Sequence, residues 1–163
     1  MKPKSAQLQI RVTAAEKAAI QRLAKDAGLD MSAYVLERVL SSPAAQFANH
    51  VGACRQDDSA RFALAELNSF LSGLSALELM DAVAVLPAGK MSSFVANYVA
   101  ALVESACQRK NVPLPQWLGS IEPLAEPFFA SGLQSLRLYL LTQSPAPFRG
   151  RNIFVDSSLG DRV

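Results

Sequence analysis

Near the N-terminus, apolar and polar residues alternate along a short segment. Every second position of residues 5–13 is apolar, which is typical of a β-strand with one buried face. Side chains on one face are Leu8, Ile10 and Val12, and those on the other are Gln7, Gln9 and Arg11. The pattern therefore predicts one short strand with a polar outer face.

Two segments with helical spacing follow this strand. Thr13 and Glu16 have the spacing of a capping box, so we expect a helix over residues 14–27, ended by Gly28 in a left-handed conformation. Asp30 is a suitable N-cap for a second helix over residues 31–40, and Pro43 follows its end. The first 43 residues thus have the order strand, helix, helix.

A unit of this size cannot bury its apolar residues alone, and a lone strand leaves its backbone unpaired. We therefore predict residues 1–43 to be a domain that pairs with a second copy through its strand, as an obligate homodimer. The expected dimer core consists of Leu8, Ile10, Val12, Ile20, Leu23, Val35 and Val39.

The rest of the chain, residues 44–163, has mostly helical spacing. We expect helices near 44–54, 58–73, 75–86, 91–109 and 131–143, with the fourth at the centre of a bundle. Residues 148–155 have the pattern of a short extended segment before a polar tail. The predicted fold class is mostly α, with a bundle-like second domain that binds a partner.

Composition fits a folded protein: 50% of the 163 residues are hydrophobic and 18% are charged. Residues 1–43 contain seven Lys and Arg against four Asp and Glu, whereas residues 44–163 contain nine against ten. Cys54 and Cys107 lack metal-site spacing, and we expect both to be buried. We expect a cytoplasmic protein, because neither a secretory signal nor a membrane span is recognisable.

Residues 7–40 resemble the ribbon-helix-helix family of bacterial repressors and antitoxins, the Arc- and CopG-type proteins. The resemblance rests on the alternating strand, the start of the first helix at Thr13 and Glu16, and the turn at residues 28–32. It implies that two chains form an antiparallel ribbon that enters the major groove of double-stranded DNA. The expected DNA site is an inverted repeat, because the two chains are related by a two-fold axis.

The resemblance also assigns roles to individual residues. Gln7, Gln9 and Arg11 would contact base edges, for which amide and guanidinium groups have matching donors and acceptors. Met31 and Ser32 would contact a phosphate at the start of the second helix, although Asp30 would repel that phosphate unless its carboxylate turns toward the helix. Lys2 and Lys4 would add phosphate contacts. The alternative for the three polar strand residues is a solvated surface.

Evidence for other chemistry is weak. His50 is the single histidine and has no catalytic motif around it, and Asp57 and Asp58 suit a helix start better than a metal site. We expect no enzymatic activity, no cofactor and no metal. Residues that could bind a partner are Trp117, Phe128, Phe129, Arg149 and Arg151, although the aromatic residues would equally suit the core and the arginines an ordinary surface.

Two functions fit these observations. The first is a dimeric transcriptional repressor, in particular the antitoxin of a toxin-antitoxin pair, with its C-terminal domain bound to a cognate toxin. The second is an accessory protein of plasmid mobilisation or partition that binds DNA through the same ribbon. The position of the DNA site, at a promoter or at a transfer origin, separates the two.

Overall fold

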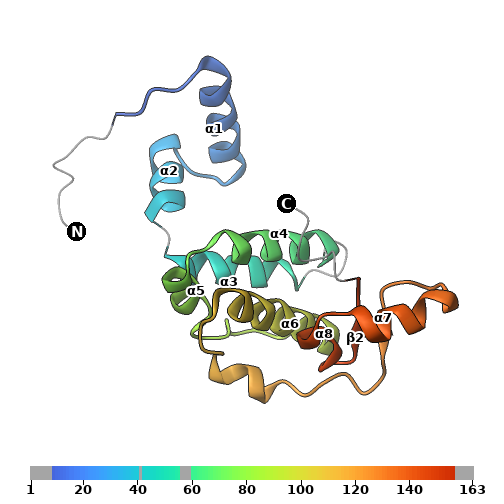
Figure 1. Cartoon of the computed structure of the whole chain (residues 1–163). Helices are drawn as coiled ribbons and strands as arrows, with labels where there is room; N and C mark the ends of the chain where they lie inside the picture. Colours follow the sequence, from blue (N-terminus) through green and yellow to red (C-terminus); the bar gives the residue numbers. More distant parts are fainter. Residues whose placement is uncertain (1–8, 41, 56–59, 157–163) are drawn as a thin grey trace. The chain divides into compact units, whose positions relative to one another are not determined.

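The computed structural model describes residues 9–40, 42–55 and 60–156, with Glu37, Val39 and Leu40 described by their backbone alone. The chain divides into two units, Met1–Ser41 and Ser42–Val163. Each unit is described by itself below (Figure 1).

The N-terminal unit contains two helices, α1 (Ala14–Asp26) and α2 (Met31–Leu40). The predicted capping box is present: the Glu16 amide donates to Thr13 Oγ1 at 3.3 Å, and the Thr13 amide donates to Glu16 Oε2 at 2.7 Å. Gly28 has φ 69°, a left-handed conformation that glycine adopts without steric cost. Both helices are confirmed where the sequence predicted them.

The predicted strand is not confirmed in the part of it that the structure describes. Residues 9–13 have no regular secondary structure, and Thr13 is extended at the helix start. A strand is defined by hydrogen bonds to a neighbouring strand, and a single chain provides none to this segment. The other residues of the predicted strand lie outside the described part of the chain.

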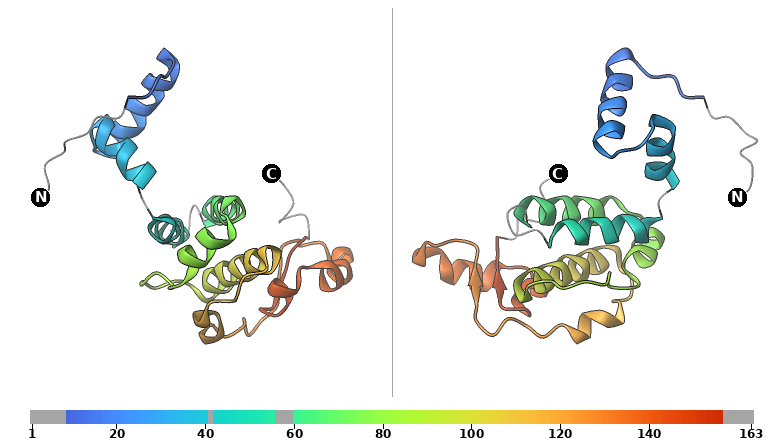
Figure 2. Two further views of the ribbon diagram at one scale, coloured as in Figure 1. Left: turned by 60° about the vertical axis from the view of Figure 1, so that its left-hand side comes forward. Right: turned by 180° about the vertical axis from the view of Figure 1, so that it is seen from behind.

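Four helices form the main body of the second unit: α3 (Pro43–Ala53), α4 (Ala60–Gly73), α5 (Ala76–Val83) and α6 (Ser93–Lys110). Ser42, Ser75 and Ser92 cap α3, α5 and α6 with their hydroxyl oxygens. In Figure 2, α3 and α4 lie side by side; α3 packs against α4 and α5, and these two helices pack against α6. These helices agree with the predicted segments to within a few residues.

Helix α6 lies at the centre of this unit, as its apolar pattern predicted. Half of its residues are buried, and it packs against α4, α5 and α8. Such burial from several sides provides most of the stability of a helix in a folded protein. The helix ends at Asn111, which has φ 52°.

The C-terminal part contains short elements. These are the 3-10 helices η2 (Gln116–Ser120) and η3 (Gln134–Leu136), the helices α7 (Arg137–Gln143) and α8 (Ala146–Arg149), and the strands β1 (Phe128–Phe129) and β2 (Ile153–Phe154). The two strands are parallel, with Phe128 opposite Ile153. In both Figure 1 and Figure 2, α7 projects from the edge of the unit.

Two sequence predictions are partly wrong in this region. The helix predicted for residues 131–143 begins at Arg137, after the separate turn η3. Residues 148 and 149 are helical, not extended, because Pro147 occupies the first turn of α8, where its missing amide is not needed. Only Ile153 and Phe154 of the predicted extended segment form a strand.

A buried polar network joins α6 to the C-terminal segment. Arg151 is 8% exposed and forms an ion pair with Glu104 at 3.5 Å. Its guanidinium also donates to Asn97 Oδ1 at 3.5 Å and to the carbonyl oxygens of Leu118 and Ile121 at 3.4 Å each. Arg151 therefore links α6 and the segment around residues 118–121 to the C-terminal segment inside the unit. This differs from the exposed position, free to contact a partner, that the sequence suggested for it.

Candidate nucleic-acid interface

The segment that precedes α1 exposes the polar side chains expected to contact DNA bases. Gln9 and Arg11 are both exposed, within a segment that has no regular secondary structure. Their donor groups are therefore accessible to a ligand. Gln7, Lys2 and Lys4 lie outside the described residues.

The first turn of α2 is the expected phosphate contact. Met31 and Ser32 are both exposed there, and free amides at a helix start favour an anion. The Asp30 carboxylate accepts a hydrogen bond from the Ala33 amide at 2.9 Å. The Asp30 carboxylate therefore points toward the helix, which the expected phosphate contact requires. It also accepts the hydrogen bond of the Ala33 amide, which is one of the donors that could otherwise bind the phosphate.

Apolar side chains of the same unit are exposed to an unusual degree. The exposed fractions of Ile10, Val12 and Leu23 are 61%, 44% and 51%, whereas Ile20 and Val35 are half-buried. Among the described residues of α1, Ala24 alone is buried. Leu8 and the side chain of Val39 lie outside the described part. An apolar surface of this kind marks a protein interface.

Basic side chains around this apolar surface are exposed as well. Arg11, Lys17, Arg22 and Lys25 are all solvent-accessible, so they can attract phosphate groups. The Thr13 backbone amide and hydroxyl donate to Glu16 and lower the pKa of its carboxyl. Glu16 therefore remains ionised and bound to the start of α1.

Most of the C-terminal residues predicted to bind a partner pack within the second unit. Trp117 Nε1 donates to the carbonyl oxygen of Val83 at 2.7 Å, and the Phe129 ring stacks on Phe154 with centroids 4.8 Å apart. Phe128 is 37% exposed, and Arg149 is exposed. These two residues remain accessible, whereas Arg151 does not.

Sequence reasoning missed the polar partners of Arg151. Asn97 is 1% exposed and also donates from Nδ2 to the carbonyl oxygens of Ser93 and Glu122, at 3.0 and 2.9 Å. An asparagine on the apolar face of a predicted core helix is the signal that could have found the network, because a buried amide needs partners.

The described residues contain no cluster of three or more histidine, cysteine or carboxylate side chains that could hold a metal ion. Cys54 and Cys107 are free and buried, as expected. His50 lies in α3, with its ring 4.8 Å from that of Phe70. Asp57 and Asp58 lie outside the described residues. No helix in the described ranges is long and apolar enough to cross a membrane.

Comparison with known proteins gives one finding. Residues 2–76 match the sequence model of the NikA-like family, described as mobilization protein NikA. The match covers the N-terminal unit and continues through α3 and α4 of the second unit. Neither the curated proteins nor the solved structures contain a significant match.

Proposed function

We propose that this protein is a dimeric, sequence-specific DNA-binding protein that acts in the mobilisation of a plasmid or a similar transferable element. The observation that carries the proposal is the match of residues 2–76 to the mobilization protein family. The exposed polar and apolar side chains in the same region supply the chemistry. The protein acts on DNA by binding and has no catalytic role.

Two chains pair through the segment before α1. A second copy covers Ile10 and Val12, whose exposure in one chain is too large for a stable isolated unit. The same pairing turns Gln9 and Arg11 to the opposite face, because side chains alternate along a strand. Arg11 can then donate two hydrogen bonds to guanine, and Gln9 can pair with adenine.

The first turn of α2 fixes the position of the ribbon on the duplex. Backbone amides and the Ser32 hydroxyl contact a phosphate there, and the exposed basic residues of α1 add a contribution that depends on salt. These contacts orient the protein, whereas the ribbon reads the sequence.

The antitoxin function expected first is not the one we propose. The family match supports the mobilisation alternative, and no observation on this chain points to a toxin or to repression. The second unit, with its buried helix α6, is then a platform that meets other components of a DNA-transfer complex.

Selection of bound duplexes from a random pool tests this function. We expect recovery of one short motif, present as two half-sites, that occurs at the transfer origin of the element that carries the gene. A motif located only at the promoter of its own gene would support repression instead. Absence of any enriched motif would contradict sequence-specific binding.

Substitution of Arg11 tests the ribbon directly. We expect Arg11→Ala to weaken binding to the selected duplex by about 1–3 kcal/mol and to relax the preference at one base pair in each half-site. Fluorescence anisotropy over a set of single-base variants measures both effects. Lys4→Ala should weaken all duplexes equally and reduce the salt slope by roughly one.

A matched control is Lys90→Ala, which removes one positive charge from an exposed position of the second unit. It should leave affinity and sequence preference unchanged. Equal effects of Arg11→Ala and Lys90→Ala would show that the segment before α1 does not read bases.

A further inference from the structure

One carboxylate ties the segment before α1 to the helix. Glu16 Oε2 accepts hydrogen bonds from the Thr13 amide at 2.7 Å and from the Thr13 hydroxyl at 2.9 Å. In return, the Glu16 amide donates to Thr13 Oγ1 at 3.3 Å, and the Lys17 amide donates to the Thr13 carbonyl oxygen at 3.0 Å. Together these bonds fix the orientation of Thr13 relative to the first turn of α1.

Arg11 lies two residues before Thr13, with Val12 between them. Within the described part of the chain, residues 9–12 form no hydrogen bond of their own. Each residue has two soft backbone dihedrals, so the short link through Val12 transmits the orientation of Thr13 to Arg11. The direction in which the segment leaves the helix is therefore set by the contact between Thr13 and Glu16.

A helix of this chain does not need such a carboxylate to be capped. Ser42 and Ser92 cap α3 and α6 with their hydroxyl oxygens alone. What Glu16 adds at α1 is a bond to the backbone amide of the N-cap residue, which orients the chain that enters the helix. Its negative charge, next to the exposed Lys17, opposes the binding of phosphate groups. The contribution of Glu16 to DNA binding is therefore one of orientation, not of attraction.

We propose that Glu16 is a positioning residue for DNA recognition, which holds Thr13 so that the Arg11 guanidinium meets its base in the correct direction. This role rests on the proposed function, in which Arg11 contacts a base. A guanidinium that donates two hydrogen bonds to guanine depends on direction, whereas an ammonium near a phosphate acts as a point charge. Glu16 thus contributes to the choice among sequences more than to overall affinity.

Two duplexes that differ at the base pair contacted by Arg11 test this role. The base preference is the ratio of their dissociation constants for the whole chain, measured by fluorescence anisotropy. We expect Glu16→Ala to lower this ratio about fivefold, because the Arg11 side chain loses its fixed starting point. Glu16→Gln should keep most of the ratio, since the glutamine carbonyl still accepts from the Thr13 amide. A loss of helix stability alone would weaken binding to both duplexes and leave the ratio unchanged.

Helix α5 provides a matched control in the second unit. The Ser75 amide donates to Glu78 Oε2 at 2.8 Å, and the Glu78 amide donates to Ser75 Oγ at 3.3 Å, which is the same capping box. Glu78→Ala removes it and should leave the base preference intact. Glu16 and Glu78 are both exposed, so neither alanine leaves a cavity, and circular dichroism checks the helix content. An equal loss of preference in Glu78→Ala, or no loss in Glu16→Ala, would overturn the positioning role.

A double substitution links Glu16 to Arg11. In a chain that carries Arg11→Ala, Glu16→Ala should change the base preference no further, because Glu16 acts through Arg11. A second loss of the same size would show that Glu16 acts on a different contact and would overturn the proposal. If the unsubstituted chain has no base preference, the proposed function fails and the role of Glu16 fails with it. If the preference exists and Glu16→Ala retains it, the role of Glu16 alone fails.

Discussion

At the scale of single residues, Arg149 and Arg151 show how position decides the role of a side chain. Both lie in the same short segment, yet Arg149 is exposed and Arg151 is 8% exposed. A buried guanidinium is tolerated because several acceptors and one carboxylate surround it. Those groups come from positions 97–121, so no local pattern around residue 151 could have predicted its burial.

Substitution of these two arginines should separate their roles. We expect Arg151→Ala to lower the free energy of unfolding by about 2–4 kcal/mol, since it leaves Glu104 and Asn97 without their buried partner. Arg149→Ala should change it by less than about 0.5 kcal/mol. Urea denaturation followed by circular dichroism measures both. Equal stabilities would show that the network contributes nothing.

The two cysteines should react slowly in the native protein. Burial and the nearby Glu66 raise the pKa of Cys54 to about 11, and burial with the nearby Glu104 raises that of Cys107. A raised pKa keeps the thiol protonated near neutral pH, and the thiolate is the reactive form. We expect iodoacetamide to modify neither cysteine at pH 8 and both in urea, as read by mass spectrometry. Modification of the native protein would contradict their burial.

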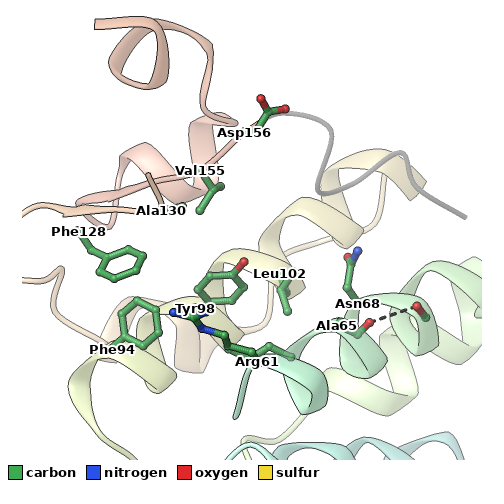
Figure 3. Close-up of a pocket in the computed structure, with 12 residues that line it drawn as sticks. Arg61, Ala65, Asn68, Phe94, Tyr98, Leu102, Phe128, Ala130, Val155 and Asp156 are labelled. Atoms are coloured by element: carbon green, nitrogen blue, oxygen red, sulfur yellow. Dashed lines mark hydrogen bonds between the residues drawn. The ribbon is translucent and has the colours of Figure 1, made fainter. Parts of the chain in front are cut away.

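At the scale of elements, the helices were predictable where their signals are local. The caps at Thr13, Asp30, Ser75 and Ser92 lie within three residues of the amides that they bind. The strand predicted for residues 5–13 was not found in its described part, residues 9–13, because no other described segment of the chain pairs with it. A pocket of about 770 Å³ between α4 and α6 (Figure 3) is lined by residues from four segments far apart in the sequence, so no single motif could have identified it.

Asp30 combines a structural and a functional effect at the start of α2. Asp30→Asn keeps an N-cap acceptor for the Ala33 amide and removes the charge beside the expected phosphate. We therefore expect unchanged helix stability and DNA binding several-fold tighter at low salt. Asp30→Ala should instead cost about 1 kcal/mol of stability. Thermal unfolding and anisotropy separate the two effects, and weaker DNA binding by Asp30→Asn would argue against a phosphate at this turn.

At the scale of the whole molecule, the two units differ in how they reach stability. The second unit buries a large apolar cluster around α6, whereas the N-terminal unit leaves Ile10, Val12 and Leu23 exposed. The apolar pattern in the sequence identified these three residues without showing whether their own chain covers them. Their exposure in one chain is the physical reason why we propose that the N-terminal unit forms a dimer.

Substitution of Ile10 tests that assignment. We expect the unsubstituted chain to be a dimer that binds the selected duplex. Ile10→Asp should make it a monomer and weaken DNA binding by about two orders of magnitude or more, because a carboxylate would be buried against the second strand. Sedimentation equilibrium and anisotropy measure the two effects.

Leu77→Asp is the matched control, because Leu77 is 81% exposed in the second unit. It introduces the same charge and should change neither the mass nor the affinity. A chain with Ile10→Asp that remains dimeric and binds DNA would place the pairing surface elsewhere. If Ile10→Asp abolishes both dimerisation and DNA binding while the helix content is retained, the two chains must share a strand. The apolar face of that strand would then hold the second copy in place and, through it, set the position of Arg11 on the opposite face.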